Sequence, residues 1–255
     1  MITEELEGKV VILSGGFNKT APTVAETFAR EGCKLILVDL KNEHEDESGR
    51  ALIKKLREQG IEVVSIAADL SKPEDIERMC QTALEAFGQV DIIVNLAGPF
   101  NVEPWQVLTP ETYDRIMNVN VRAIYLLAKG LSAQMKLQGW GKIINFSAGS
   151  AYTKNHNVYS LAKMGVQHIT ESLALELGPE ITVNAVCPGQ LEESAAVAIK
   201  RDPTAVDKYI AKAPLKKLVN RQDVANLLVL MCTHYFDLVT GMTIRIDGGA
   251  EIGQF

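Results

Sequence analysis

Residues 9–21 read KVVILSGGFNKTA, and this stretch decides the fold. After Lys9, residues 10–13 form an apolar, largely β-branched run that predicts a buried strand. Gly15 and Gly16 follow the strand, and a helical pattern begins at residue 22. A strand, a glycine turn and a helix in direct succession are typical of the first unit of a parallel α/β sheet.

The same alternation continues along the chain. Short strands are predicted at 9–13, 34–39, 62–67, 91–95, 142–146, 182–186 and 243–247. Helical patterns lie between them at 22–30, 49–59, 73–87, 110–137, 158–177 and 222–233. Several strands are apolar at consecutive positions, as expected where helices cover both faces of a sheet. We therefore expect the α/β class, with a single Rossmann-type, doubly wound parallel sheet of about seven strands and helices on both faces.

The sequence of 255 residues is 47% hydrophobic and shows no linker, internal repeat or low-complexity tract. We expect one Rossmann-fold dinucleotide-binding domain that spans residues 1–255. The longest stretch without a strong pattern runs from about 190 to 215 and is polar. Such a segment in a compact domain is a disordered loop or a functional lid, and we expect a substrate lid.

Charge and cysteine usage narrow the class of partner. The net charge is −6, which argues against nucleic acid or a membrane surface as a partner. The first residues carry acids where a secretory signal has a basic region, and no apolar run has the length of a membrane helix. The cysteines are isolated and lack metal-ligand spacing, so we expect reduced thiols, no metal site and a cytoplasmic location.

The turn after the first strand is a candidate phosphate-binding turn. A glycine pair between a strand and a helix N-terminus brings backbone N–H groups toward a pyrophosphate, although a plain connecting turn uses the same glycines. The second predicted strand ends at Asp39, 24 residues after Gly15. An acid near this spacing accepts hydrogen bonds from the adenine ribose and repels a 2′-phosphate, which favours NAD(H) over NADP(H).

Tyr159 and Lys163 form the candidate catalytic pair. They lie four residues apart near the start of a predicted helix, so their side chains share one helix face. A cation close to a phenol favours the phenolate, and we expect Lys163 to lower the pKa of Tyr159.

Taken together, these residues resemble the short-chain dehydrogenase/reductase family across nearly the whole chain. The matching pieces keep the family's order and approximate spacing. They are Ser14-Gly15-Gly16, Asp39, Asp69-Leu70, Asn95-Leu96-Ala97-Gly98, Asn118-Val119-Asn120, Ile144-Asn145-Phe146-Ser147, Tyr159 with Lys163, Asn184-Ala185-Val186-Cys187-Pro188-Gly189 and Ile246-Asp247-Gly248-Gly249.

The resemblance implies roles for the matching side chains. Tyr159 would be the general acid/base, Lys163 would hold the nicotinamide ribose, Asn120 would support a proton-relay water by bending its helix, and Ser147 would bond the substrate oxygen. The residues expected to bind the cofactor, besides Tyr159 and Lys163, are Ser14, Gly15, Gly16, Asn18, Lys19, Asp39, Leu40, Asp69, Leu70, Asn95, Ala97, Gly98, Pro188, Gly189 and Leu191. The family also implies a homodimer or homotetramer built through the helices at 110–137 and 158–177.

The chain departs from the family pattern at three places. Lys19 and Ala21 stand where the family has glycines, and Lys19 removes backbone freedom while adding a charge that can reach a phosphate. The family's second serine after the fifth strand falls on Ala148, which leaves Ser147 or Ser150 as the replacement, with a purely structural Ser147 also open.

The third departure is Glu193, which replaces a threonine that contacts the cofactor phosphates in the family. A carboxylate there would repel a pyrophosphate. Two interpretations stay open: Glu193 pairs with Lys19 and weakens or gates cofactor binding, or it turns to solvent in the lid.

The substrate is expected to be a small carbonyl or alcohol. Its pocket is expected between Pro99, Phe100 and Trp105, the segment 152–157 and the lid, with Lys154 and His156 hinting at a polar or anionic molecule. Two functions compete. One is an NAD(H)-dependent oxidoreductase that interconverts a secondary alcohol and a ketone, with Tyr159 as general acid/base. The other is a non-catalytic relative that senses a ligand or redox state, or serves as an oligomer partner, with weakened cofactor binding.

Overall fold

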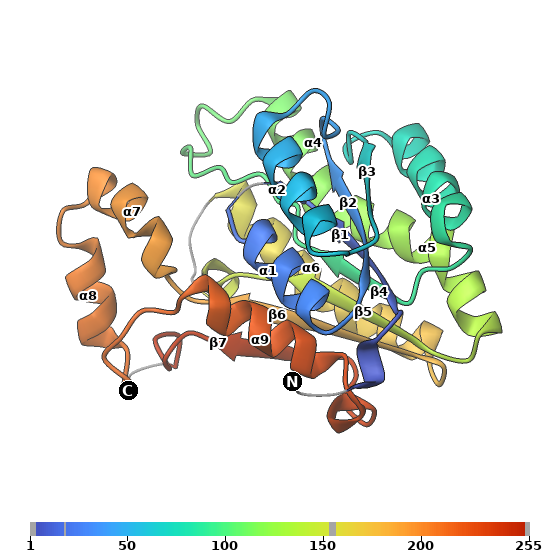
Figure 1. The fold of residues 1–255 in the computed structure, drawn as a ribbon. Coiled ribbons are helices and arrows are strands. Elements are labelled where there is room, and N and C mark those ends of the chain that lie inside the picture. Colours follow the sequence, from blue (N-terminus) through green and yellow to red (C-terminus); the bar gives the residue numbers. More distant parts are fainter. Residues whose placement is uncertain (1–3, 18, 153–156, 253–255) are drawn as a thin grey trace.

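A computed structural model describes residues 4–17, 19–152 and 157–252. In this part of the chain the strands form one parallel seven-stranded sheet of order β3-β2-β1-β4-β5-β6-β7 (Figure 1). The strands are β1 (Val10–Ser14), β2 (Lys34–Asp39), β3 (Val63–Ala67), β4 (Ile92–Asn95), β5 (Gly141–Phe146), β6 (Ile181–Pro188) and β7 (Thr243–Ile246). The doubly wound α/β sheet predicted from the sequence is thereby confirmed.

Consecutive apolar residues in the strands supply both faces of the sheet. In β1, Val11 and Leu13 pack into one core cluster, whereas Val10 and Ile12 pack into the other. This division follows from the period of two in a strand. The first cluster is covered by α1 (Ala21–Arg30), α2 (Glu47–Glu58) and α9 (Arg221–Met231) (Figure 1). The second is covered by α3 (Pro73–Phe87), α5 (Ala123–Leu137) and α6 (Val158–Leu177).

The helix predicted at 110–137 is interrupted. It consists of α4 (Pro110–Met117), a π-helical turn at Asn118–Arg122, and α5. The side-chain amide of Asn120 donates to the carbonyl of Ile116, four residues earlier, at 2.9 Å, and to the carbonyl of Pro99 at 3.2 Å. A side chain that takes a carbonyl from the helix ladder shifts the backbone bonding, and the N–H of Ala123 accordingly donates to the carbonyl of Asn118, five residues back.

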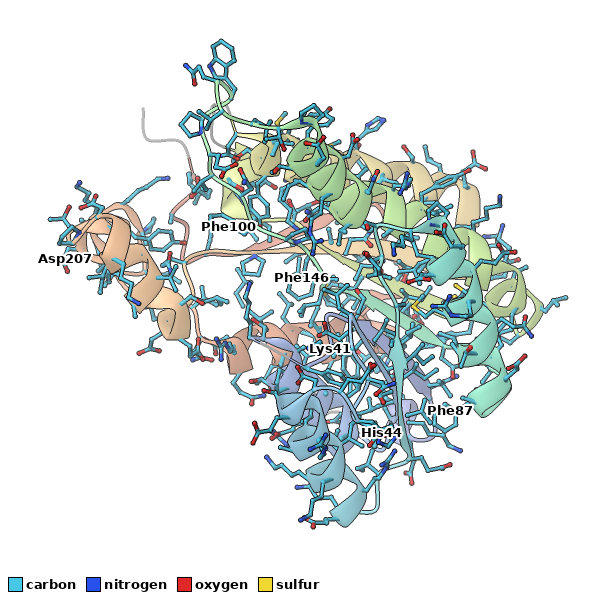
Figure 2. All side chains as sticks on the ribbon, turned by 90° about the horizontal axis from the view of Figure 1, so that it is seen from above. Lys41, His44, Phe87, Phe100, Phe146 and Asp207 are labelled. Atoms are coloured by element: carbon cyan, nitrogen blue, oxygen red, sulfur yellow. The ribbon has the colours of Figure 1, made fainter. Side chains whose placement is uncertain are left out.

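The expected lid contains two short helices that the sequence analysis did not predict, α7 (Ala195–Arg201) and α8 (Ala205–Lys212). Figure 2 shows α8, which carries Asp207, standing out to one side of the sheet. None of the residues in α8 is buried. Without a buried apolar face, such helices leave little signal in the sequence.

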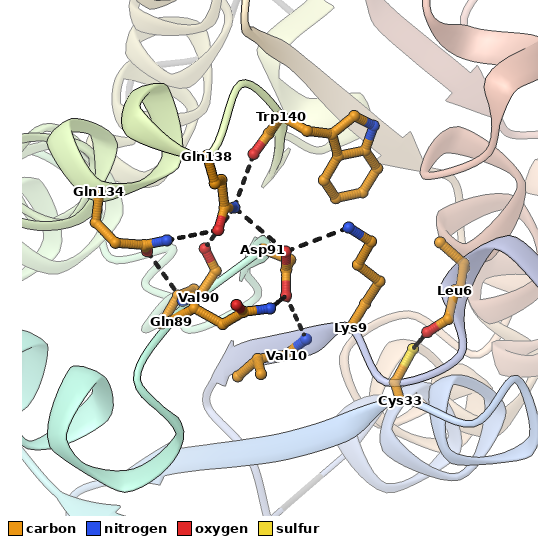
Figure 3. A network of polar contacts seen from close by, with 10 residues as sticks. All are labelled: Leu6, Lys9, Val10, Cys33, Gln89, Val90, Asp91, Gln134, Gln138 and Trp140. Carbon is orange, nitrogen blue, oxygen red and sulfur yellow. Dashed lines mark hydrogen bonds and ion pairs between the residues drawn. The ribbon is translucent and has the colours of Figure 1, made fainter.

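The amino-terminal edge of the sheet is held by a buried carboxylate (Figure 3). Asp91 is 1% exposed, and its oxygens accept hydrogen bonds from the Val10 N–H at 2.8 Å and from the side-chain amides of Gln89 at 2.8 Å and Gln138 at 3.2 Å. Lys9 forms an ion pair with the same carboxylate at 3.4 Å. This network fixes the edge opposite to the one where the strands present their carboxyl ends.

The structure also locates the cysteine side chains. All four cysteines are buried and free. In the described part of the chain, no group of three or more His, Cys, Asp or Glu side chains gathers as metal ligands. Among the same residues, none of the helices combines the length and apolarity that crossing a bilayer requires.

Candidate active site

A cavity of about 610 Å³ opens at the carboxyl ends of β1, β2 and β4. The chain passes from β1 to β2 and β3 on one side and then to β4 on the other, so the cavity lies where the strand order reverses. The predicted cofactor residues that line it are Gly15, Lys19, Asp39, Leu40, Asp69, Leu70, Ala97 and Gly98. The predicted cofactor residues that do not line it are Ser14, Gly16, Asn95, Tyr159, Lys163, Pro188, Gly189 and Leu191, and Asn18 lies outside the described residues.

The turn after β1 is packed too tightly for side chains at its two glycines. Gly15 has a φ of +74°, and a Cβ there would lie 3.1 Å from the Cα of Ala97. A Cβ on Gly16 would lie 3.0 Å from the Cβ of Leu37. The Ser14 hydroxyl accepts a hydrogen bond from the Ala97 N–H at 3.2 Å, which ties the turn to the end of β4. The N–H groups of Gly15 and Gly16 both donate to the Val38 carbonyl, at 2.8 and 2.9 Å, so the turn is held close against β2 and β4 while Gly15 lines the cavity.

Lys19 adopts the backbone conformation that a glycine would adopt. Its φ is +57°, in the left-handed region, although its side chain is a lysine. A Cβ disfavours this conformation, and Lys19 therefore lacks the freedom of a glycine, but the turn keeps the conformation at a strain of about 1–2 kcal/mol. Ala21 is fully buried at the start of α1, so its methyl group fits in the core.

The N-terminus of α1 leaves backbone donors for a ligand. Its N-cap residue, Thr20, makes no side-chain capping bond, and the first turn holds no acid. The first N–H groups of a helix need partners from outside the helix, and their partial positive charge attracts anions. The glycine turn and this helix end together fit a dinucleotide phosphate.

Asp39 and Asp69 line the cavity from neighbouring strand ends. The Asp39 carboxylate accepts bonds from the N–H groups of Phe17 at 3.2 Å and Leu40 at 2.8 Å. Asp69 accepts bonds from the N–H and the hydroxyl of Ser71 at 3.0 and 2.7 Å. Partial burial opposes ionisation of Asp69, but the bonds from Ser71 outweigh it and lower its pKa. Asp69 is thus ionised at neutral pH.

Tyr159 and Lys163 lie in the first turns of α6, which the side chain of Asn157 caps by accepting the N–H of Ser160 at 2.8 Å. The Lys163 Nζ lies 5.4 Å from the centre of the Tyr159 ring and donates to the carbonyl of Phe146 at 2.7 Å. Phe100 contacts Tyr159 edge to face, with 4.8 Å between ring centres. The shared helix face predicted for the pair is present.

The pKa of Tyr159 is shifted opposite to the expected direction. Burial raises it to about 12, and the neighbouring Cys187 adds to the rise. Burial likewise lowers the pKa of Lys163 to about 8, against a smaller opposing effect of Cys187. Removing both groups from water disfavours phenolate and ammonium alike, and this desolvation outweighs the attraction between them. The phenol is therefore protonated at neutral pH.

Asn120 and Lys163 converge on Gly98. A Cβ on Gly98 would lie 2.7 Å from the Asn120 Oδ1 and 3.1 Å from the Lys163 Nζ, so only a glycine fits between them. The Asn120 side chain is 1% exposed, and its Oδ1 has no hydrogen-bond partner among the described residues. A buried carbonyl oxygen beside a lysine is suited to holding a bridging water.

Asn95 and Ser147 have structural partners. The Asn95 amide donates to the Asn145 side chain at 2.8 Å and so links β4 to β5. Ser147 is 3% exposed, and its hydroxyl donates to the backbone carbonyl of Lys163 at 3.1 Å. This contact favours the structural interpretation of Ser147. Ser150 lies in the following 3-10 turn, Gly149–Tyr152.

Glu193 does not pair with Lys19: no ion pair joins the two described side chains. Its carboxylate instead accepts the backbone N–H of Arg221, the first residue of α9, at 3.0 Å. Arg221 and Arg115 both line the cavity, and sequence reasoning missed them. They come from α9 and α4, far from any glycine motif, and only the fold brings them to this place.

The expected substrate region is described in part. Phe100 contacts Tyr159, while Trp105 is 63% exposed. Lys154 and His156 lie outside the described residues. Leu191 forms a parallel bridge with Val219 at the base of the lid.

Comparison with known proteins adds independent findings. A family model described as enoyl-(acyl carrier protein) reductase matches residues 20–251. The chain is 32% identical to an uncharacterised oxidoreductase of Thermotoga maritima over 251 residues, which cover 96% of this chain and 98% of the relative. It is 32% identical to glucose 1-dehydrogenase 2 of Bacillus subtilis over 255 residues, 98% of this chain and 97% of the relative.

Among solved structures, a gluconate 5-dehydrogenase from Burkholderia cenocepacia, crystallised with NADP and tartrate, superposes with a TM-score of 0.88. Its sequence is 21% identical, and the match covers 97% of each chain. At this identity the likeness establishes the shared fold.

Proposed function

We propose that this chain interconverts a secondary alcohol and a ketone with NAD(H), using Tyr159 as general acid/base. The chain belongs to the short-chain dehydrogenase/reductase family. Members of this oxidoreductase family bind nicotinamide cofactors and act on CH–OH and C=O groups. The observation that carries this proposal is the position of Lys163. Its Nζ lies 5.4 Å from the centre of the Tyr159 ring and converges with the Asn120 Oδ1 on the cavity glycine Gly98. The same convergence argues against a non-catalytic binding protein, which has no need of a proton-handling group there.

The described residues fit a dinucleotide. Gly15 lines the cavity without a side chain, and α1, which begins beside it, has no side-chain cap on its first N–H groups. When bound, the nicotinamide supplies or accepts the hydride. The residues of the chain would hold the phosphates at the turn, the adenine ribose at Asp39 and the nicotinamide ribose at Lys163.

The proton would move through groups of this chain. In the direction of reduction, the protonated phenol of Tyr159 donates to the carbonyl oxygen of the substrate, which takes up the developing negative charge. Its pKa of about 12 keeps it protonated in the free protein. Lys163, with a pKa near 8, and the unpartnered Oδ1 of Asn120 are suited to pass a replacement proton through water.

The preference for NAD(H) over NADP(H) rests on Asp39. Its carboxylate lines the cavity at the end of β2 and is held by two backbone N–H groups. A fixed negative charge at the adenine ribose would repel a 2′-phosphate. The Burkholderia enzyme was crystallised with NADP, but it is only 21% identical to this chain, so its cofactor does not indicate the preference of this chain.

The assembly is proposed to be a homodimer or homotetramer in the cytoplasm, with each chain acting as one domain. Large apolar side chains stand exposed on the helices that the family uses for assembly, among them Tyr125 on α5 and Leu161 and Met164 on α6. Burial of these side chains against another copy would remove them from water.

The test is reduction of a panel of small ketones, aldoses and keto acids with NADH, followed by loss of absorbance. The wild type should turn over at least one member, and Tyr159→Phe should lose nearly all of this activity while still binding NADH. Tyr235→Phe, which removes the hydroxyl of an exposed tyrosine, is the matched control and should keep wild-type rates. A wild type that binds neither NADH nor NADPH and reduces nothing would sink the proposal.

A further inference from the structure

The cavity contains a partly buried cationic group that the proposed mechanism leaves unused. Arg221 lines the cavity, and its Nε is buried without a hydrogen-bond partner among the described residues. No ion pair of Arg221 is present in the same part of the chain. A guanidinium that loses water without gaining an acceptor is costly, and such a group is expected where a ligand supplies the acceptor.

The backbone of Arg221 is held in place by its neighbours. Glu193 accepts its N–H at 3.0 Å, and the side chain of Asn220 forms a capping box with Asp223 at the start of α9. The next residue, Gln222, donates to the hydroxyl of Thr27 on α1 at 3.0 Å. The start of α9 is therefore fixed against α1, the helix that begins at the glycine turn.

Lys19 brings a second cation to the same cavity from the glycine turn. It lines the cavity and is exposed, and its backbone holds a left-handed conformation that a lysine adopts only under strain. Strain of this kind marks positions where the side chain serves a purpose that a glycine would not serve. Among the described residues, no ion pair joins Asp39 or Asp69 to either cation.

We infer that Lys19 and Arg221 together bind the diphosphate of the dinucleotide, in place of contacts that the altered turn and Glu193 no longer provide. This inference rests on the proposed function and extends it to two residues outside the catalytic machinery. Arg221 offers the planar fork that matches phosphate oxygens, and Lys19 offers a point charge beside the backbone donors of the turn and α1.

The third cation of the cavity, Arg115, serves as a matched comparison. It lies on α4, is exposed, and acts electrostatically on Asp69 rather than on the glycine turn. Loss of its charge should not remove a diphosphate contact.

The experiment measures dissociation constants of adenosine, 5′-ADP, 2′-AMP and NADH for wild type, Lys19→Met, Arg221→Met and Arg115→Met. Methionine keeps an apolar stem and removes the charge. Lys19→Met and Arg221→Met should each raise the Kd for 5′-ADP and NADH by about tenfold or more, with adenosine and 2′-AMP unchanged. The affinity of these variants for 5′-ADP should also depend less on salt. Arg115→Met should match the wild type.

Lys19→Gly and Arg221→Gln provide a second route if a methionine variant does not fold. Lys19→Gly relieves the left-handed strain and should lose the same affinity for 5′-ADP while unfolding at a higher temperature. Wild-type affinity for 5′-ADP in both the Lys19 and Arg221 variants overturns the inference and leaves the proposed function standing. A loss of affinity for 2′-AMP alone overturns it as well, because the cations would then bind a 2′-phosphate. Failure of the wild type to bind any dinucleotide instead removes the proposed function.

Discussion

The ammonium group of Lys163 donates a 2.7 Å hydrogen bond to the backbone carbonyl of Phe146, the last residue of β5. One residue on, the Ser147 hydroxyl returns a bond to the backbone carbonyl of Lys163 at 3.1 Å. The two bonds lock the first turns of α6 to the carboxyl end of β5. The residue proposed to hold the ribose is thus also a structural link, and it is 4% exposed.

Replacing Lys163 should abolish activity and raise the free energy of unfolding. Its pKa falls from the ordinary 10.5 to about 8 in the folded protein because it is buried. The unfolded state therefore binds more protons between these values, so this group makes the wild type more stable as pH rises from about 8 to 10.5. We expect Lys163→Met to lose activity and, at pH 7, to exceed the wild type in free energy of unfolding by roughly 1–3 kcal/mol.

Urea unfolding at pH 7 and at pH 10 checks this expectation. The advantage of the variant should shrink at the higher pH, where the wild-type lysine is neutral in the fold and its bond to Phe146 remains. An advantage that is independent of pH would mean that the ammonium is not the source of the cost.

Ser147→Ala should affect stability more than turnover. The variant loses the bond to the Lys163 carbonyl and should unfold with about 1 kcal/mol less free energy, because a buried acceptor loses its donor. Ser150→Ala should lower kcat more than Ser147→Ala does. Steady-state kinetics with the best ketone of the panel measures kcat for both variants. A large fall in kcat for Ser147→Ala alone would show that Ser147, and not Ser150, contacts the substrate.

Asp39→Ser should change the choice of cofactor. Removal of the carboxylate ends the repulsion of a 2′-phosphate, and we expect the ratio of kcat/KM for NADPH over NADH to rise by about tenfold or more. Asp114→Ser, on the exposed surface of α4, controls for a general change in charge. An unchanged ratio would show that Asp39 serves only the N–H groups of Phe17 and Leu40.

Asp91→Ala should weaken the fold and leave the site untouched. The carboxylate at the amino edge of the sheet holds four donors, including the Val10 N–H and Lys9 (Figure 3). Its loss leaves buried groups unsatisfied and should lower the free energy of unfolding by roughly 2–4 kcal/mol. The Kd for NADH should stay at the wild-type value, as it should in the surface control Asp207→Ala. A lower affinity at unchanged stability would contradict this separation.

The strands and most helices could be predicted because each carries its own signal. The predicted 158–177 and 73–87 coincide with α6 and α3, where a long apolar period or a proline in the first turn marks the boundaries. The bend at Asn120 was expected from the family resemblance alone. The helical pattern of 110–137 gave no sign of the π-helical turn at Asn118–Arg122, because the turn depends on the amide of Asn120 reaching the carbonyls of Ile116 and Pro99.

The candidate site was likewise predictable only in part. Gly15, Asp39 and the Tyr159–Lys163 pair follow from local spacing, and the fold places them around the cavity and α6 as expected. The pKa of Tyr159 was predicted in the wrong direction, since spacing reveals a neighbouring charge but not the burial that outweighs it. Glu193 was interpreted from its position in the chain, whereas its partner is a backbone group of Arg221, 28 residues away.

The lid begins and ends at one point of the fold. Leu191 pairs with Val219, and the N–H of Glu192 donates to the Val219 carbonyl at 2.8 Å. The two ends of the segment that contains α7 and α8 are therefore joined to each other. A segment whose two ends already meet can be lengthened, trimmed or exchanged at little entropic cost to the rest of the chain. The sheet and the cavity can therefore stay constant while this segment changes. If it acts as the expected substrate lid, new substrate preferences can arise here by evolution or by grafting.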